Sequence, residues 1–372
     1  MSQSIDISII SSGASFADAR LHRLTRALVR ADLRVEIFAP GSASDALQDK
    51  NVIARKPLIG AKWKSTSLLA RYYRSRIFVL RSKGRVIYAI SPEAVAPAYG
   101  FARLLGRHFA VDFFENYLQL LKDRAWARKY FGVLGLIASS DTKSALWFAK
   151  RADLTTVADV QVPPFDARNR LVVRNLPDRS TLTMSGERDT TPRAIYIGDL
   201  RKSRGLLAML EVAALAPDWE FDFVGGVATT DQGKVDQWFM EHPTAAARVR
   251  FHGKLPPAQS WEIAAGAWVG LSLLENTPAF VEAVPSKLYE YMFVGLATIS
   301  TPLPRCAELI EKSGSGAIEN TPEDVAARLG QWKKNPAELD RLRTNGMNWA
   351  AINLDSEREY LTFAAEMVKL TR

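Results

Sequence analysis

The chain has 372 residues, of which 47% are hydrophobic, and a formal net charge of +9. This length favours two domains, and the apolar content suffices for ordinary cores. No apolar run approaches the roughly 20 residues of a membrane-spanning helix, and the first residues lack the basic and apolar regions of a signal peptide. One cysteine, Cys306, and four dispersed histidines argue against a disulfide and a structural zinc site. We therefore expect a cytoplasmic protein.

The basic residues are concentrated in the first half of the chain. Residues 1–178 contain 28 Lys or Arg and 15 Asp or Glu, so the remainder is mildly acidic. A basic half can attract anionic lipid, nucleic acid or a phosphorylated substrate.

Strand and helix patterns alternate from the N-terminus. An apolar run at Ile5–Ile10 predicts a strand, and Ala17–Ala31 has the apolar spacing of a helix. A second strand is predicted at Arg34–Phe38, which makes a right-handed βαβ unit. Further strands of this half are predicted at Val86–Ile90, Phe109–Phe113, Leu154–Val157 and Leu171–Val173.

A polar segment rich in Pro and Gly interrupts the pattern at 175–193 and reads as a linker. The pattern then restarts. Strands are predicted at Ala194–Ile197, Phe221–Val224, Arg248–Phe251, Val269–Leu274 and Leu296–Ser300, and helices at Leu206–Ala214, Ser286–Val294 and Glu357–Leu370.

The sequence thus predicts an α/β protein of two Rossmann-like domains that face a central cleft. We assign 1–178 to an N-terminal domain and 179–193 to the linker. Residues 194–350 form a C-terminal domain, and 351–372 a helix that could pack back on the first domain. Open sheets of this kind bind ligands beyond the carboxyl ends of their strands.

The most informative segment is FVEAVPSKLYEYMFVGLATISTP at 280–302. Pro285 suits a helix start and Gly295 a helix end. The free N–H groups and dipole at the helix start suit a diphosphate, and Lys287 adds a positive charge. Glu290, one turn into the helix, could bind a ribose diol, while Glu282 could face a sugar hydroxyl. Two glutamates at this spacing, taken alone, would favour an amphipathic helix with incidental glutamates.

This segment resembles the Glu-x7-Glu donor motif of the retaining GT-B glycosyltransferases of family 4, with departures at Phe293 and Ala297. The resemblance implies that Glu290 binds the nucleotide ribose and that Glu282 contacts the transferred sugar in catalysis. The family's phosphate-binding positions correspond here to Ser286, Lys287 and Leu288. The resemblance also implies that 194–350 form the nucleotide-sugar-binding domain and 1–178 the acceptor-binding domain.

Residues 194–207, AIYIGDLRKSRGLL, resemble the opening of the family's C-terminal domain, in which an Arg and a Lys neutralise the leaving diphosphate. Arg204 matches the Lys position, and Asp199 stands where the family has Arg. Arg201 is therefore a shifted candidate. Both are assigned a catalytic role, and the alternative is solvated loop charges, for Lys202 as well.

Other donor-side positions follow from weaker resemblances. FHGKLP at 251–256 is similar to a loop that borders the nucleobase, which implicates Lys254 and Leu255. Gly13 lies in a loop that the family brings close to phosphate.

On the acceptor side we place Asp18 and Arg20, which could equally be an ordinary helix N-cap region. FAVDFFEN at 109–116 is similar to a family segment that contains a histidine near the reacting sugar. Here Phe114 replaces that histidine, while Asp112 and Glu115 remain as acceptor-side candidates.

Residues 62–85 are rich in Lys, Arg and aromatic residues and contain no acidic residue. They could form an amphipathic helix on an anionic membrane, or a helix packed on its own sheet with a solvated basic face. Nucleic-acid binding is less favoured, because no nucleic-acid-binding motif accompanies the charge.

We therefore expect a glycosyltransferase that moves a hexose-type sugar from a nucleoside diphosphate sugar, with UDP favoured, and retains the anomeric configuration. The acceptor would be a glycan or a lipid-linked saccharide of cell-surface polysaccharide or glycolipid synthesis. No metal or other cofactor is expected, and the enzyme could be peripheral on the inner membrane face. The alternatives are an inverting GT-B enzyme with a base at Asp18, Asp112 or Glu115, and a degenerate GT-B domain that acts as a partner protein.

Overall fold

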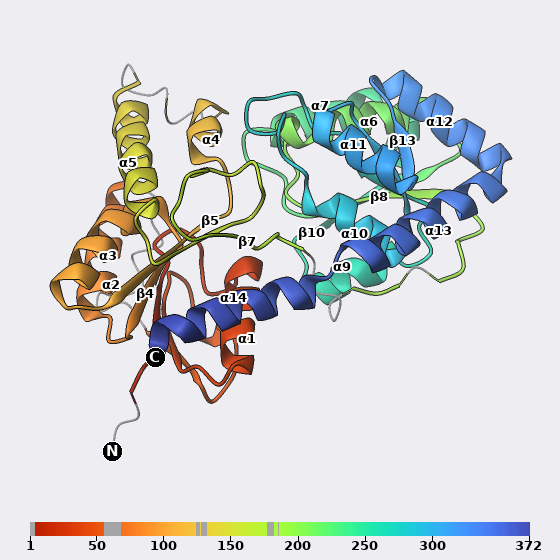
Figure 1. The fold of residues 1–372 in the computed structure, drawn as a ribbon. Coiled ribbons are helices and arrows are strands. Elements are labelled where there is room, and N and C mark those ends of the chain that lie inside the picture. Colours follow the sequence, from red (N-terminus) through yellow and green to blue (C-terminus); the bar gives the residue numbers. More distant parts are fainter. Residues whose placement is uncertain (1–3, 56–67, 124–126, 128–131, 177–181, 185) are drawn as a thin grey trace. The chain divides into compact units, whose positions relative to one another are not determined.

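The computed structural model describes residues 4–55, 68–123, 127, 132–176, 182–184 and 186–372. The chain forms two compact units (Figure 1). Unit 1 comprises residues 1–175 and 356–372, and unit 2 comprises 176–355.

Unit 1 is built on a parallel seven-stranded sheet with the order β3-β2-β1-β4-β5-β6-β7. The strands are β1 (Ile7–Ile10), β2 (Val35–Phe38), β3 (Val52–Arg55), β4 (Val86–Ala89), β5 (His108–Phe113), β6 (Leu154–Val157) and β7 (Arg170–Val172). The helices are α1 (Ala19–Arg30), α2 (Leu68–Arg81), α3 (Pro92–Leu104), α4 (Tyr117–Asp123), α5 (Val133–Ala149) and α14 (Ser356–Thr371), with a short 3-10 turn, η1 (Ala43–Asp45).

The central strands of unit 1 are apolar on both sides because helices cover both faces of the sheet. Ile7 and Ile9 of β1 belong to a core with α1 and α14, whereas Ile10 belongs to a core with α2, α3 and α5. Phe363 and Met367 of α14 are fully buried in the first of these cores. Helix α14 lies along α1, so the C-terminal segment returns to the unit formed by the start of the chain (Figure 1).

Unit 2 has a parallel six-stranded sheet with the order β10-β9-β8-β11-β12-β13. The strands are β8 (Arg193–Ile197), β9 (Glu220–Val224), β10 (Val249–Gly253), β11 (Val269–Ser272), β12 (Ala297–Ser300) and β13 (Gly316–Ile318). The helices are α6 (Leu206–Leu215), α7 (Gln232–Glu241), α8 (Pro243–Ala246), α9 (Pro257–Ala264), α10 (Ser286–Val294), α11 (Pro304–Ser313), α12 (Pro322–Lys334) and α13 (Pro336–Asn353), with a 3-10 turn, η5 (Lys202–Arg204).

Unit 2 also buries apolar side chains on both faces of its sheet. Tyr196 of β8 lies in a core with α6 and α12, and Ile195 and Ile197 lie in a core with α9 and α10. Both sheets belong to the Rossmann-like class expected from the sequence.

The described residues of the segment expected as a linker pack on unit 2, as do 351–355. The N–H of Asp189 donates to Gly266 O at 2.9 Å, and Trp268 Nε1 donates to Asp189 O at 2.8 Å. These bonds satisfy backbone groups that a solvated linker would leave to water, so the units divide after Asn175 rather than within 179–193.

Within the described part of the chain, no helix is both long and apolar enough to cross a bilayer.

Candidate active site

Helix α10 places the Glu-x7-Glu segment at the carboxyl side of the unit 2 sheet. It begins after Pro285 and ends at Gly295, whose φ of +76° is the left-handed conformation that suits glycine at a helix end. These are the bounds expected from the sequence. No side chain caps the start of the helix, and the N–H of Leu288 donates to Pro285 O at 3.1 Å. The N–H groups of Ser286 and Lys287 therefore keep their capacity to bind an anion.

Lys287 and Glu290 form an ion pair on the first turns of α10. Lys287 Nζ lies 2.5 Å from Glu290 Oε2 and 5.5 Å from the centroid of the Trp261 ring. Both charged side chains are largely buried. The residue expected to bind phosphate, Lys287, is thus paired with the residue expected to bind ribose, Glu290. A bound nucleotide would have to replace this ion pair with its own contacts to both side chains.

Glu282 lies in the exposed loop before α10. Arg305 Nη1 donates to its carbonyl oxygen at 3.1 Å, and Cys306 Sγ donates to Ala283 O at 3.5 Å. Burial raises the pKa of the Cys306 thiol to about 11. At neutral pH this cysteine is therefore a packed thiol rather than a nucleophile.

The turn after β8 is built around glycine. Gly205, with a φ of +83°, joins η5 to α6, and a β-carbon there would lie 2.0 Å from Leu273 O. This close approach brings η5 against the end of β11. The N–H of Glu275 also donates to Ser203 O at 3.1 Å, so the turn with Arg204 and the loop that leads to Glu282 are adjacent.

Arg204 is the cation that this turn positions. Its Cζ lies 6.0 Å from the centroid of the Phe280 ring, in the loop before α10. Its Nε is buried and has no hydrogen-bond partner. A buried guanidinium donor without an acceptor is costly, and a phosphate oxygen is the acceptor that arginine binds best.

Tyr196 supports Arg204 from the end of β8. Its hydroxyl donates to Asp199 O at 3.2 Å. Burial raises the pKa of this tyrosine, and the hydrogen bond and positive charge of Arg204 oppose that rise. The tyrosine is therefore a neutral hydroxyl beside the guanidinium.

Arg201, the shifted candidate, is paired with the residue that replaces the family arginine. Its Nη2 lies 2.7 Å from Asp199 Oδ2, while its Nε is buried without a partner. The carboxylate of Asp199 thus offsets part of the positive charge of Arg201. The neighbouring Lys202 is exposed.

The loop expected to border the nucleobase follows β10. Gly253 has a φ of +68°, and its carbonyl accepts from the N–H of Gly225 at 2.8 Å. A β-carbon at Gly225 would lie 1.8 Å from Gly198 O, so the ends of β8, β9 and β10 approach closely. Lys254 is exposed, whereas Leu255 packs against the core under α9 and α10.

Two of the four acceptor-side residues of unit 1, Arg20 and Asp112, pair with each other. Asp18 caps α1 by accepting from the N–H of Leu21 at 2.9 Å. Arg20 Nε and Nη2 each donate to the Asp112 carboxylate at 2.7 Å, and both side chains are buried. The Asp112 carboxylate also accepts from Thr156, so this pair is closed to a substrate in the present conformation. Glu115 is exposed.

Gly13 lies in the exposed loop after β1, and its N–H already donates to Ser91 Oγ at 3.3 Å. A β-carbon at Gly13 would lie 2.6 Å from Arg71 Nη2. Arg71 of α2 therefore lies over one side of Gly13.

The basic segment 62–85 is described from residue 68 onward, and residues 62–67 lie outside the described part. Two of its arginines face inward. Arg74 donates to Ser12 O at 3.0 Å, and Arg71 Nε lies 2.5 Å from Glu93 Oε1. Leu69, Tyr73 and Leu80 are exposed instead, so α2 is packed on its sheet and presents apolar residues outward.

Three groups of the candidate site were not predicted from the sequence: Tyr196, Phe280 and Trp261. Each is an aromatic residue beside a predicted cation, and each lies at the end of a strand or close to α10. Only their position next to the motifs could have signalled them, because aromatic residues are more often simple core residues. Within the described residues, no group of three or more His, Cys, Asp or Glu is arranged to hold a metal ion.

Comparisons with known proteins bear on unit 2 and on the fold of the whole chain. Residues 182–349 match the model of the family described as Glycosyl transferases group 1. Among curated proteins, no sequence matches the chain.

Several solved structures share the fold. Sucrose-phosphate synthase from Thermosynechococcus elongatus has a TM-score of 0.73 at 14% identity, and the match covers 99% of both chains. HepE from Anabaena in complex with UDP-glucose has a TM-score of 0.70 at 14% identity, with coverage of 99% of this chain and 100% of HepE. WaaG, a glycosyltransferase of lipopolysaccharide biosynthesis, has a TM-score of 0.66 at 11% identity, with 98% and 99% covered. The chain therefore has the two-unit GT-B fold, and residues 182–349, which match the Glycosyl transferases group 1 model, support glycosyltransferase activity.

Proposed function

We propose that the enzyme transfers a hexose-type sugar from a nucleoside diphosphate sugar to a glycan or a lipid-linked saccharide with retention of configuration. The observation that carries the proposal is the buried, unpartnered Nε of Arg204 beside the loop that leads to Glu282 and α10. It supports an anion at this place, and the uncapped start of α10 supports the same ligand.

Each motif residue then has a role in donor binding. Glu290 takes the ribose diol, Glu282 the transferred sugar, and Ser286, Lys287 and Leu288 the diphosphate. Lys254 and Leu255 border the base. The structure of HepE with UDP-glucose supports a UDP-sugar as the donor.

In the proposed reaction the bond between the anomeric carbon and the leaving phosphate oxygen breaks. The acceptor oxygen forms the new bond on the same face, and its proton passes to the leaving diphosphate. Arg204, with Arg201 and Lys287, stabilises the charge that develops there, so that positioning and electrostatics supply the rate. We propose that transfer needs no metal, and activity that EDTA abolishes and a divalent cation restores would contradict this.

The donor assignment is tested by thermal shift with UDP, GDP, dTDP and ADP, because a ligand of the native state raises the unfolding midpoint. We expect UDP to give the largest shift and Glu290→Ala to reduce it. Product NMR with a competent acceptor then reads the anomeric configuration. An inverted product, or nucleotide binding with neither transfer nor hydrolysis, would favour the inverting enzyme or the partner protein instead.

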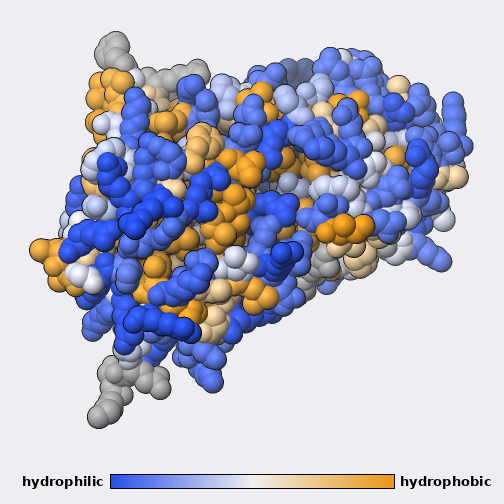
Figure 2. All heavy atoms as spheres, viewed as in Figure 1, coloured by the Kyte–Doolittle hydropathy of each residue, from blue (hydrophilic) through white to orange (hydrophobic). Residues whose placement is uncertain are grey.

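We further propose that unit 1 docks on an anionic membrane at the cytoplasmic face, where a lipid-linked acceptor would reside. The exposed residues Leu136 and Trp147 of α5 and Leu80 of α2 support this, as does the exposed Arg76. Figure 2 shows apolar side chains interspersed with hydrophilic ones over this part of unit 1. Equal sedimentation with anionic and with neutral vesicles would contradict the proposal.

A further inference from the structure

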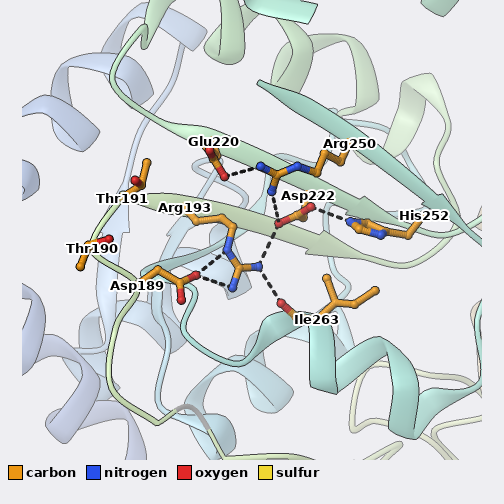
Figure 3. A pocket seen from close by; sticks show the side chains of 9 residues that line it. All are labelled: Asp189, Thr190, Thr191, Arg193, Glu220, Asp222, Arg250, His252 and Ile263. Atoms are coloured by element: carbon orange, nitrogen blue, oxygen red, sulfur yellow. Dashed lines mark hydrogen bonds and ion pairs between the residues drawn. The ribbon is translucent and has the colours of Figure 1, made fainter. Parts of the chain in front are cut away.

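A network of charged side chains lies behind the loop that follows β10. Asp222, in the middle of β9, is 2% exposed. One of its carboxylate oxygens lies 2.5 Å from His252 Nε2, and the other accepts from Arg193 Nη1 at 2.9 Å. Figure 3 shows these side chains pointing toward one another across the three neighbouring strands. A carboxylate only accepts, so the ring of His252 donates from Nε2.

Arg193 connects this network to helix α9. Its guanidinium donates to the carbonyl oxygens of Ile263 and Ala265 at 2.6 Å each, and it pairs with Asp189 on its other side. These carbonyls close the C-terminal end of α9, where a positive charge is favourable. The first residue of β8 therefore fixes the end of the helix.

The network thereby anchors both sides of one loop. His252 directly precedes Gly253, at a place where the pairing of β10 with β9 shifts its register. Helix α9 begins at Pro257, directly after Leu255 and Pro256. His252 thus fixes the start of the loop 253–256, and Arg193 fixes the helix that follows the loop. Three of the loop's four residues, Gly253, Lys254 and Pro256, are exposed, while Leu255 packs on the core.

The network reaches the surface in a polar cavity of about 480 Å³. Besides Asp222, Arg193 and Asp189, the charged groups that face His252 are Arg250 and Glu220, which pair with each other at 2.6 Å. The cavity holds three carboxylates and two guanidiniums, and each of them pairs with another group of the cavity. The cavity therefore carries no unsatisfied charge that would call for a ligand of its own.

We propose that the chain Arg193–Asp222–His252 positions the loop 253–256 and so sets the affinity for the nucleoside end of the donor. This inference rests on the proposed function, in which that loop borders the base. The diphosphate end is held elsewhere, at Arg204 and the start of α10. His252 is a positioning residue that acts on the ligand through the loop.

The experiment compares two ligands in His252→Ala. Because the substitution removes a hydrogen bond to a buried charge, we expect UDP to bind about tenfold more weakly. Inorganic pyrophosphate, which does not reach the loop, should bind as in the wild type. In transfer assays KM for the donor should rise about tenfold while kcat stays within about twofold.

Two variants separate positioning from general damage. His252→Gln, whose side-chain amide can donate to Asp222, should restore UDP affinity. Arg250→Ala removes a charge from the same cavity but none of the hydrogen bonds among Arg193, Asp222 and His252, since Arg250 meets Asp222 only in an ion pair of 3.9 Å, and it should leave UDP affinity unchanged.

The outcomes distinguish this inference from the proposed function. If the wild type binds no nucleoside diphosphate, both the proposed function and the positioning role are overturned. If the wild type binds UDP and His252→Ala binds it equally well, only the positioning role is overturned. Equal weakening of UDP and pyrophosphate would also overturn it, because the defect would then be structural.

Discussion

The two units place charged residues near the ends of their central strands in opposite ways. In unit 1, Arg20 and Asp112 neutralise each other in a buried bidentate pair, and Arg71 pairs with Glu93. In unit 2, Arg204 keeps a buried Nε with no acceptor and, unlike Arg201, has no carboxylate partner among the described residues. Charge at the carboxyl end of a sheet is therefore not enough to identify a binding site. The informative residue is a cation for which the protein provides neither a carboxylate partner nor an acceptor for its buried donor.

The largest expected effect follows from removing Arg204, the cation without a partner for its Nε. Arg204→Ala should lower kcat by about 10²- to 10³-fold, the usual cost of losing one group that stabilises transition-state charge. Arg204→Lys should recover only part, because lysine cannot bind phosphate bidentately. Steady-state kinetics with a competent donor measure both. The exposed neighbour Lys202→Ala is the matched control and should stay within about threefold of the wild type. A kcat unaffected by Arg204→Ala would show that the unpartnered Nε of Arg204 does not mark a binding site, and the contrast with the paired charges of unit 1 would lose its meaning.

The closed pair of unit 1 should respond in stability rather than in catalysis. Asp112→Ala leaves Arg20 as an uncompensated buried charge, which costs about 3–5 kcal/mol of unfolding free energy. Urea denaturation measures this loss. The folded fraction should keep kcat within about twofold. The exposed Glu115→Ala serves as the control and should change stability by no more than about 0.5 kcal/mol.

If Asp112→Ala instead lost activity at unchanged stability, the carboxylate would act on the substrate. The acceptor-side role, or the base of an inverting enzyme, would then regain support.

The smallest expected effect concerns the cap of α1. Asp18→Ala should cost about 1 kcal/mol, since the N–H of Leu21 loses its acceptor. Asp18→Ser should restore most of that stability because serine caps equally well. Thermal unfolding measures both variants. A drop in kcat that serine does not rescue would show that the carboxylate, and not the cap, is what matters at this position.

Local features of the fold could be read from the sequence because they depend on neighbouring residues. Pro285 and Gly295 determine the bounds of α10 through their backbone preferences, and Asp18 is a helix cap by its type and place. The partner of Arg20 lies 92 residues away, across the sheet, and no local pattern reports such a contact. Sequence alone therefore overestimated the number of charged residues available to a ligand.

The basic segment illustrates the same limit. Its composition predicts a helix with a charged side, but the register of α2 against its sheet decides which charges turn inward. Arg74 and Arg71 are used to hold the loop after β1, which leaves apolar residues outside. A surplus of arginine is thus partly a structural requirement of unit 1.

The return of α14 to unit 1 has a consequence for synthesis. As the chain leaves the ribosome from its N-terminus, unit 2 is complete once residue 355 has emerged, whereas the core of unit 1 still lacks Phe363 and Met367. The first 175 residues therefore keep the apolar surface that α14 covers exposed while 180 more residues are synthesised. Unit 1 is translated first but can finish folding only after unit 2 has been made, and a nascent chain that lacks α14 exposes apolar surface of the kind that chaperones bind.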